Sequence, residues 1–499
     1  MSLRENTMCG KTELNFSYCE IPDSVSLPEL TVFAAPEEAP ANNTFSVFVR
    51  YEGGQWIHLH EYDAEVDGGY SSKPLHHMAF VAFDADFSKK IEVKVHKNDG
   101  PMSNVRIRPD IAGIIPMIID KHTISFTLTE PKKLSVEVNG ELHNNLMVFA
   151  NRPEADPVKA GAENVYYFGP GIHKIGGNGR GSLVLKSNDK VYIAGGAMVY
   201  GSIEAFGVKN VSVTGRGILC GGMYTDHAYP HKAGKRLIWV DRSSDIKIDG
   251  ITLLNTVTWN IHISNSSDIV CNNLKIMGWT INSDGINPTS SSNVLIDDCF
   301  IRNFDDCISV KLGYGRSASP AGKDSRHITV QNTILWTDQG RAVALGPEFY
   351  SDEQKIMENM TFRNIDILYN KNYNVEWAKG VLSILLGDDV TLQNIVFEDI
   401  RVDRIGSNTN LICLTILQTN EYNLTPGRQI RDITFNRVSL HSKPNIASTI
   451  RGYDHSRMIT GIAFTDLKIN NAYIKDAAAG HIRMNEYTQD VKFRVAVSR

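Results

Sequence analysis

Apolar and polar residues alternate with period two, in short runs, from about residue 25 to residue 150. Turn-forming clusters, such as those at residues 52–54 and 139–140, separate the runs. Short alternating strands at this spacing are typical of an antiparallel β-sandwich. The clearest runs are Ser46–Arg50, Met78–Phe83, Ile91–Val95, Ile124–Leu128 and Leu134–Val138. We therefore predict a β-sandwich domain over residues 25–150, between an N-terminal extension of residues 1–24 and a proline-containing linker at residues 151–160.

A different pattern fills the chain beyond this linker. One polar residue is followed by an aliphatic, a polar and an apolar residue, as in Asn210-Val-Ser-Val213 and Asp245-Ile-Lys-Ile248. The first aliphatic residues of the ten copies stand at positions 211, 246, 269, 294, 328, 360, 390, 433, 462 and 491. Successive positions are 35, 23, 25, 34, 32, 30, 43, 29 and 29 residues apart. The shortest separations equal about one coil of a parallel β-helix and the longer ones leave room for inserted loops, so the pattern predicts a solenoid.

Each copy continues into a second apolar run, such as Asn272–Met277, as a coil built from strand, tight turn and strand requires. The leucine-rich repeat signature is absent, and no run shows the 3.6-residue period of a helical repeat. The predicted fold is therefore all-β, with a right-handed parallel β-helix over residues 161–499 behind the antiparallel β-sandwich. Strands of such a body stack about 4.8 Å apart, so one exposed face forms a groove for an extended polymer.

Composition and charge exclude several classes of function. Hydrophobic residues make up 42% and charged residues 21% of the chain, which is typical of a soluble globular protein and not of a disordered one. The net charge of -5, from 51 basic and 56 acidic residues, lacks the basic excess of a nucleic-acid binder. No stretch approaches the ~18 to 20 apolar residues of a membrane span, so we expect neither a nucleic acid nor a membrane as a partner.

The cysteines and histidines give no strong metal signal. The seven cysteines are scattered without a CxxC pair, so we expect no zinc site, no disulfide framework and no cofactor. An insert at residues 223–236 is expected to wall the groove, and its His227 and His231 lack a carboxylate in register. The N-terminus has no apolar signal core, so we expect a cytoplasmic protein as the sequence stands, or a secreted or periplasmic one if a signal peptide was removed. The oligomeric state stays open.

Three carboxylates stand out against the repeat. Asp284 lies 21 residues before Asp305, which is about one coil, and Asp306 follows directly, so we expect Asp284 and Asp305 to stack on adjacent coils. Crowded carboxylates repel one another, and at least one of them then holds a proton near neutral pH. Such a set protonates a leaving oxygen and activates water, as glycoside hydrolysis requires. Turn formation explains aspartate at these positions equally well, so the spacing alone leaves both interpretations open.

The sequence around these carboxylates resembles two known families. Residues 282–287, Asn-Ser-Asp-Gly-Ile-Asn, and 303–311, Asn-Phe-Asp-Asp-Cys-Ile-Ser-Val-Lys, resemble the core of the family 28 glycoside hydrolases, the polygalacturonase family. Thr258-Trp-Asn-Ile-His262 is similar to a Trp-x-x-His stretch of that family. Segments at residues 167–173, 191–201 and 215–221 look like family 49, the dextranases and isopullulanases, which also carry a β-sandwich before the β-helix.

The resemblance implies an inverting glycoside hydrolase without a cofactor. Asp305 would be the general acid, and Asp284 and Asp306 would position and deprotonate the attacking water. The implied substrate is an α-linked polysaccharide or oligosaccharide, either a glucan of the dextran or pullulan type or a pectin-type glycan. One departure concerns specificity: Arg341 stands where family 28 has the histidine of Gly-His-Gly, and the Arg-Ile-Lys that grips a uronate is absent. Arg341 is therefore expected to pair either with a substrate carboxylate or with Asp306.

Further residues are candidates for contacts with sugar. Trp259 and His262, one coil before Asp284, either form the floor of a sugar subsite or are buried in the core. Asn282 belongs to the Asn-Ser-Asp motif that contains Asp284. Lys311 either reaches a substrate oxygen or is solvated. Aromatic side chains offer flat platforms but are also ordinary core residues, so packing is the alternative for each of them. These platform candidates, expected in inserted loops, are Tyr314, Trp336, Tyr350, Tyr373 and Trp377.

Two other functions compete with hydrolysis. A β-helix polysaccharide lyase would need a calcium-binding carboxylate cluster and a basic Arg or Lys, and it would lose activity in chelator. A non-catalytic glycan-binding protein would bind the polymer without releasing reducing ends.

Overall fold

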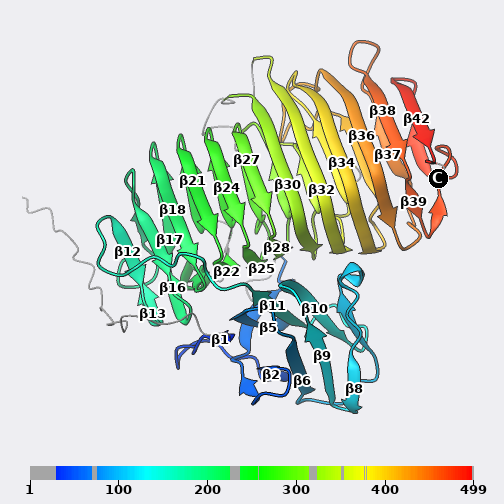
Figure 1. The fold of residues 1–499 in the computed structure, drawn as a ribbon. Coiled ribbons are helices and arrows are strands. Elements are labelled where there is room, and N and C mark those ends of the chain that lie inside the picture. The colour runs from blue at the N-terminus through cyan, green and yellow to red at the C-terminus, as the bar shows by residue number, and fades with distance from the viewer. Residues whose placement is uncertain are drawn as a thin grey trace, which may run out of the picture.

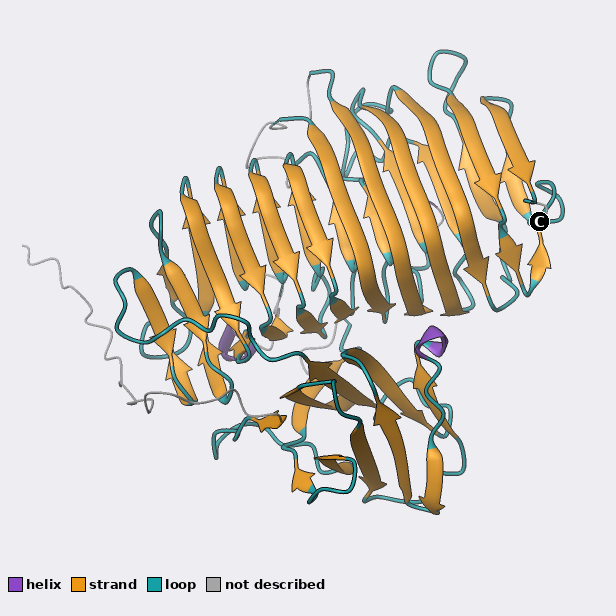
Figure 2. Cartoon of the chain, in the orientation of Figure 1, coloured by secondary structure: helices purple, strands orange, loops and turns teal. Residues whose placement is uncertain are grey.

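The computed structural model describes residues 30–69, 76–224, 236–256, 258–313, 323–349, 353–375, 377 and 379–496. The predicted extension of residues 1–24, and with it Cys9 and Cys19, lies outside them, as do His227, His231, Tyr314 and Tyr350. Strands dominate the described part, and the helices whose bounds are described are the short 3₁₀ turns η1 (Asp110–Ala112) and η2 (Gly222–Tyr224) (Figure 2). Neither turn is long and apolar enough to cross a bilayer.

The N-terminal part is a two-layer sandwich, drawn in blue to cyan in Figure 1. One sheet holds β1 (Leu30–Val32), β4 (Tyr62–Val66), β5 (His76–Ala85), β7 (Val105–Arg108), β10 (Lys132–Val138) and β11 (Leu146–Asn151). The other holds β2 (Phe45–Tyr51), β3 (Ile57–His58), β6 (Ile91–Lys97), β8 (Met117–Asp120) and β9 (Thr123–Leu128). The alternating residues of β2 and β6 bury Val47 and Val93 between the sheets, which explains the period-two pattern.

One pairing differs from the predicted antiparallel sandwich. The pairings inside both sheets are antiparallel except for β5 with β11, which run parallel with Phe80 beside Met147. Parallel neighbours need a long crossover connection, and the 60 residues between Ala85 and Leu146 supply it. Local alternation specifies that a segment is a strand but not which strand it pairs with, so sequence reasoning could not find this exception.

The remainder is a parallel β-helix whose strands form a 20-stranded and an 11-stranded sheet, and the predicted fold class is confirmed (Figure 1). The first comprises β12 (Val165–Phe168), β13 (Gly171–Lys174), β15 (Lys190–Ile193), β16 (Ala197–Tyr200), β18 (Lys209–Gly215), β19 (Ile218–Cys220), β21 (Ser244–Asp249), β22 (Thr252–Thr256), β24 (Ser267–Asn272), β25 (Lys275–Gly278), β27 (Ser292–Asp297), β28 (Phe300–Asn303), β30 (Ser325–Thr337), β32 (Ile356–Asn370), β34 (Thr391–Ile405), β36 (Gln429–Leu440), β38 (Ile459–Thr465), β39 (Lys468–Ile469), β40 (Ala472–Tyr473) and β42 (Thr488–Arg494). The second comprises β14 (Ser182–Val184), β17 (Ser202–Phe206), β20 (Ile238–Asp241), β23 (Ile261–Ser264), β26 (Ile286–Thr289), β29 (Ile308–Val310), β31 (Val343–Leu345), β33 (Leu382–Leu386), β35 (Ile412–Ile416), β37 (Ser448–Arg451) and β41 (Ile482–Met484).

The polar residue that opens each repeat has a conformational role. In every coil it adopts a left-handed backbone, which Asn, Asp and Gly tolerate better than other residues. The positions and φ angles are Asn210 56°, Asp245 55°, Asp268 59°, Asn293 55°, His327 54°, Asn359 57°, Asn394 56°, Asp432 58°, Gly461 68° and Asp490 53°. This residue lies near the start of a strand, and the aliphatic residue that follows it points into the core. The Asn and Asp of the repeat therefore permit a left-handed bend in the strand, and the aliphatic residue after each of them builds the core.

The repeat assigned to Val390 from the sequence is wrong by five residues. The register pairs Met360 with Ile395 and Ile395 with Ile433, so the copy begins at Asn394. Asp388 and Asp389 also have positive φ angles, of 51° and 56°, because they form a tight turn just before β34. That turn imitates the opening of a repeat in sequence. With Ile395 as the correct position, the separations become 35 and 38 residues.

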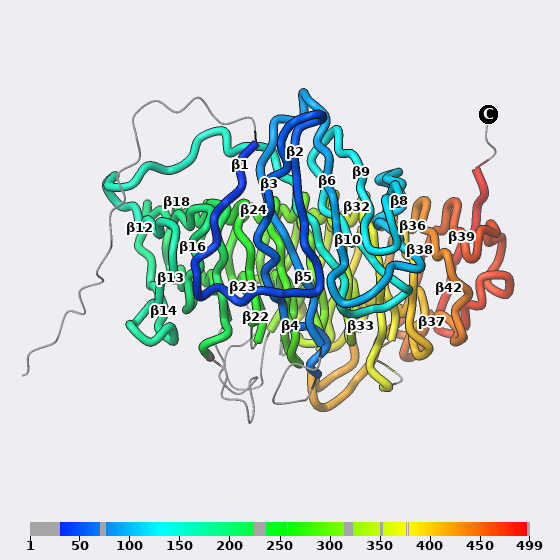
Figure 3. The backbone as a smooth tube through the Cα atoms, turned by 90° about the horizontal axis from the view of Figure 1, so that it is seen from below, coloured from blue at the N-terminus to red at the C-terminus, as the bar shows by residue number. Residues whose placement is uncertain are grey.

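The sandwich packs across the middle coils of the β-helix, as the view along the other axis shows (Figure 3). An apolar interface joins Phe80 and Phe149 of the sandwich to Phe300 of β28. Buried ion pairs flank it: Arg108 binds Glu137 and Asp403 and also donates to the Leu368 carbonyl oxygen. The sandwich therefore docks against the coils that carry the conspicuous aspartates.

Candidate active site

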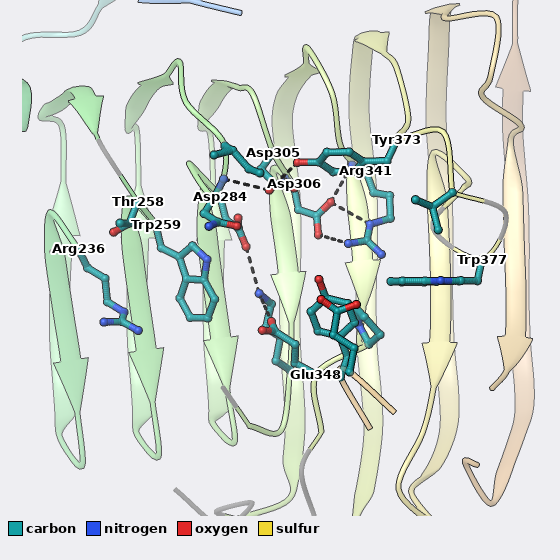
Figure 4. Close-up of a pocket in the computed structure, with 17 residues that line it drawn as sticks. Arg236, Thr258, Trp259, Asp284, Asp305, Asp306, Arg341, Glu348, Tyr373 and Trp377 are labelled. Atoms are coloured by element: carbon teal, nitrogen blue, oxygen red, sulfur yellow. Dashed lines mark hydrogen bonds and ion pairs between the residues drawn. The ribbon is translucent and has the colours of Figure 1, made fainter. Parts of the chain in front are cut away.

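A pocket of about 500 Å³ opens beside the 11-stranded sheet and contains all three aspartates singled out in the sequence (Figure 4). Its walls come from the ends of several coils and from the loops after β31, β32 and β35. The lining residues are Arg236, Thr258, Trp259, Ile281, Asn282, Asp284, Asp305, Asp306, Lys311, Arg341, Pro347, Glu348, Tyr373, Val375, Trp377, Glu421 and Tyr422.

Five of these residues occupy equivalent positions of successive coils. The strand register joins Ile238, Ile261, Ile286, Ile308 and Val343 side by side. Two residues before each of them lie Arg236, Trp259, Asp284, Asp306 and Arg341, which form one row along the pocket (Figure 4). Coils in a β-helix are about 4.8 Å apart, so neighbours in this row lie within reach of one another.

The register corrects one prediction about the aspartates. Asp284 was expected to stack on Asp305, but Ile286 pairs with Ile308 and the Gly285 N–H donates to the Asp306 carbonyl oxygen at 2.8 Å. One coil is 22 residues here, so Asp306 is the stacked neighbour of Asp284. Asp305 stands one position earlier, in the turn that precedes β29.

Asp305 receives hydrogen bonds from neutral donors. Its Oδ2 accepts from the Tyr373 hydroxyl at 2.8 Å and from the Asn282 N–H at 3.1 Å, and its Oδ1 accepts from the Asp306 N–H at 3.0 Å. Burial, followed by the charges of Asp284 and Asp306, raises the pKa of Asp305 well above its ordinary value. Arg341 and the Tyr373 hydrogen bond act in the opposite direction but are outweighed. Asp305 therefore keeps its proton to higher pH than an ordinary aspartic acid does.

Asp306 is held by Arg341 in a two-pronged ion pair. Arg341 Nε and Nη2 donate to Oδ1 and Oδ2 at 2.9 and 2.7 Å, and the Arg341 N–H donates to Oδ1 at 2.8 Å. Both side chains are buried. Of the two partners that the sequence left open for Arg341, the structure shows Asp306. The fixed fork of the guanidinium orients the carboxylate in a way that a lysine could not.

Asp284 binds a different cation. Its Oδ2 accepts from the Lys311 ammonium at 3.1 Å and from the Asn287 amide at 2.8 Å. The same ammonium forms an ion pair with Glu348, and it lies 3.9 Å from the centre of the Trp259 ring. Burial and the charge of Asp306 raise the pKa of Asp284, while Lys311 opposes the rise. Within the described residues no side chain donates to Asp284 Oδ1, so this oxygen is available to a water in the pocket.

Close backbone approaches fix these turns. A Cβ on Gly340 would lie 2.6 Å from the Asp305 carbonyl carbon, so only glycine lets the Arg341 coil approach Asp305. From the outside, the sandwich loop at Gly68 and Gly69 pairs with the segment before Asn282: the Gly68 N–H donates to the Trp279 carbonyl oxygen at 2.8 Å. The N-terminal domain thus contacts the backbone that positions the pocket residues.

The structure brings together most of the residues predicted to bind substrate. Trp259, Asn282, Lys311, Arg341 and Trp377 line the pocket, and Tyr373 lines it as well. His262 does not: it is fully buried, stacks on Trp239 at 5.6 Å and meets the edge of Trp259 at 4.8 Å. Its position explains why burial, followed by the charges of Arg236 and Lys311, lowers the pKa of its imidazole well below the ordinary value.

Trp336 corrects another expectation. The sequence placed it among candidate platforms in inserted loops, but it lies inside β30 and is fully buried. Its indole N–H donates to Asp338 at 2.9 Å, and the guanidinium of Arg302 lies 4.2 Å from its ring centre. The sequence pattern predicted a loop at Trp336. In the structure β30 continues as one strand where earlier coils have two, and it pairs with both β27 and β28.

Four charged or aromatic pocket residues were not singled out from the sequence. Arg236 could have been found, since it precedes the first strand residue of its coil by the same two positions as Asp284 does. Glu348, Glu421 and Tyr422 lie in loops with no repeat register. No local sequence pattern predicts their position, so only the folded chain shows that they line the same pocket as the aspartates.

Two groups of described residues have the ligand types for a metal ion, and both lie outside the pocket. One is Asp67, His76 and His143, in which the imidazoles stack in parallel at 3.8 Å. In-plane nitrogen lone pairs of parallel rings do not converge on one ion. The other is Asp110, Asp403 and His441, where Arg108 already binds Asp403.

Comparison with known proteins finds sequence relatives and a shared fold. Over 122 residues, 24% of this chain and 25% of the relative, the sequence is 33% identical to a probable polygalacturonase of Vitis vinifera. Over 176 residues, 32% of this chain and 38% of the relative, it is 30% identical to exopolygalacturonase A of Aspergillus niger. These matches span well under half the length of either relative. Among solved structures, Dex49A from Penicillium minioluteum superposes with a TM-score of 0.60 at 17% identity, over 93% of this chain and 96% of that one, which shows a shared fold.

The sequence model of glycosyl hydrolases family 28 matches residues 192–481. This range covers more than half of the chain and includes Asp284, Asp305 and Asp306. The chain therefore belongs to glycosyl hydrolases family 28.

Proposed function

We propose that the protein hydrolyses an α-linked polysaccharide or oligosaccharide with inversion, using Asp305 as the general acid. One observation carries this proposal: the three aspartates line one pocket but have different partners. Two of them form ion pairs with cations, and the third accepts hydrogen bonds from uncharged groups. Asp306 pairs with Arg341 and Asp284 with Lys311, whereas Asp305 is bound by a hydroxyl and two backbone N–H groups. Neighbouring carboxyl groups with such different environments divide into an acid and bases.

In the proposed reaction Asp305 donates its proton to the glycosidic oxygen as the bond from that oxygen to C1 breaks. A water attacks C1 from the opposite face of the ring. Asp284 takes a proton from this water through its available Oδ1, and Asp306, held by Arg341, accepts a hydrogen bond from the same water. The products are a new reducing end and a free hydroxyl, and solvent returns the proton from the base to Asp305.

The stereochemistry of the first product tests the proposal. Inversion at an α-linkage releases the β-anomer first, which then equilibrates with the α-anomer. We expect proton NMR of a fresh digest, with polygalacturonate, pullulan and dextran as trial polymers, to show the β-anomer signal rise before the α-anomer signal. The α-anomer rising first would contradict inversion, and unsaturated products would contradict hydrolysis.

The Tyr373 hydrogen bond predicts a shift in the pH profile. This bond stabilises the ionised form of Asp305 and so lowers its pKa, and Tyr373→Phe removes it. The pKa of Asp305 then rises further, the acid keeps its proton to higher pH, and the falling alkaline limb of kcat/KM should move to higher pH. Tyr192→Phe, which removes a similar hydroxyl bond to Glu154 far from the pocket, should leave the limb in place. An unchanged limb in Tyr373→Phe would contradict the role of Asp305 as the acid.

A further inference from the structure

Acidic groups outnumber basic ones in the pocket. Three cations and five carboxyl groups line it among the described residues. Two of the cations, Lys311 and Arg341, already bind carboxylates of the protein. The carboxyl groups also affect Tyr422, on the wall of the pocket. Burial, followed by the negative charges of Glu421, Glu348 and Asp305, raises the pKa of the Tyr422 hydroxyl above its ordinary value.

Glu348 and Asp284 together hold the Lys311 ammonium. The ammonium lies between Glu348 and Asp284, the face of Trp259 covers it, and its side chain is only 6% exposed. Burial disfavours the charged ammonium, but Asp284 and Glu348 outweigh this effect and raise the pKa of Lys311 above its ordinary value. Lys311 therefore stays protonated, and its positive charge balances carboxylates of the protein rather than a charge on the substrate.

The third cation lies farther along the groove. Arg236 is two coils from Asp284 in the register, which is about 10 Å at the spacing of stacked strands. Its guanidinium stacks on Trp239 and Trp259, at 4.3 and 5.1 Å from the ring centres. Among the three cations of the pocket, Arg236 thus lies farthest along the row from Asp306.

We propose that the two sugars joined by the cleaved bond are neutral hexopyranosyl units, and that Glu348 contributes to this specificity by binding Lys311 together with Asp284. The inference rests on the proposed function of the same site. A uronate here would add a negative charge to an already acidic, buried pocket, and like charges at short range repel. Sugar hydroxyls, in contrast, can donate to Glu348 and Glu421, and the apolar faces of the rings can pack on Trp377.

The test uses polymers that differ only at C6. Polygalacturonate is compared with its carboxyl-reduced form, and pullulan with its C6-oxidised form, by release of reducing ends. We expect the wild-type protein to have a kcat/KM at least about tenfold higher for the neutral member of the pair it cleaves. Glu348→Gln removes one of the two carboxylates that bind Lys311 and one negative charge from the pocket, while Asp284 stays bound. It should therefore shrink this ratio about tenfold by accelerating the acidic member. Glu52→Gln, which breaks an exposed ion pair with Lys90 in the sandwich, should match the wild type.

Each outcome decides the inference. Faster cleavage of the acidic member by the wild type, or an unchanged ratio in Glu348→Gln, would overturn it while leaving the proposed hydrolysis intact. If no polymer is cleaved, the proposed function fails for these linkages, and binding decides the inference instead. Calorimetry with Asp305→Asn would then compare tetrasaccharides from the same pairs: tighter binding of the neutral members supports the inference, and equal or tighter binding of the acidic members contradicts it.

Discussion

Replacing Asp305 by asparagine is expected to lower kcat by about 10²- to 10⁴-fold, the usual contribution of a positioned general acid. Asparagine has the shape of aspartic acid and keeps an oxygen for the Tyr373 and Asn282 donors, but it cannot give up a proton. The fold and the binding of substrate should therefore persist. Rates of reducing-end release, melting temperature and calorimetric affinity, measured on one preparation, separate these effects.

The leaving group supplies a sharper version of this test. A glycoside with a dinitrophenolate leaving group needs little protonation, so the loss caused by Asp305→Asn should be much smaller on it than on the polymer. Asp268→Asn is the matched control, since Asp268 occupies an exposed left-handed turn of the same repeat. Turnover of the polymer by Asp305→Asn at near the wild-type rate would remove Asp305 from its proposed role.

The β-helix was predictable because its physics repeats. Each coil needs a residue with a left-handed backbone followed by an aliphatic core residue. Ten copies of this pattern along one chain are more than chance would produce, so they identify a solenoid. The same logic explains the single slip at Val390, where a tight turn at Asp388 and Asp389 has the same composition as a repeat opening. A local pattern reports local conformation, and it fails where two different turns share one conformation.

The aspartates of the site were found from their motif, and Asp306 was one of the two partners expected for Arg341, but the partners of Asp284 and Asp305 were not predicted. Asp284, Asp305 and Asp306 come from two adjacent coils, so sequence spacing brings them close. Glu348 reaches Lys311 from a loop whose path depends on packing, and Tyr373 reaches Asp305 across 68 residues of chain. The surroundings of each aspartate, and not the motif, thus distinguish the proposed acid from the other two carboxylates. Those surroundings exist only in the folded chain.

His262 shows a second kind of limit. A histidine one coil before Asp284 is a reasonable candidate for sugar contact, yet its side chain is fully buried against Trp239 and Trp259. Positions two residues before the strand face the pocket, whereas His262 is the second residue of β23. Trp259 and His262 are three residues apart, and which of them faces the pocket depends on where the turn ends. Boundaries read from a sequence pattern are uncertain by about 2–4 residues, so the pattern could not decide between the two.

Arg341→Gln is expected to reduce both activity and stability. Asp306 would be left as a buried carboxylate without its cation, and breaking a buried pair from one side costs ~3–5 kcal/mol of unfolding free energy. Loss of the fork also lets Asp306 move, and a misplacement of about 1 Å at a reacting water lowers kcat by about 10²-fold. Denaturant unfolding and steady-state rates measure the two effects. Arg341→Lys should lie between Gln and the wild type, since it keeps the charge but not the two-pronged geometry.

The pH profile distinguishes this positioning role from general damage. Arg341 lowers the pKa of Asp305, so removing the guanidinium raises that pKa, and the alkaline limb of kcat/KM should move to higher pH. Arg401→Gln is the matched control: Arg401 binds Asp366 with the same two-pronged geometry on the partly exposed face of β34, and its loss should cost less than about 1 kcal/mol and leave the profile in place. If both arginine variants lose activity equally with unshifted limbs, Arg341 acts only through stability. A limb that moves in Arg341→Gln alone shows that the guanidinium tunes the pKa of Asp305 as well as holding Asp306.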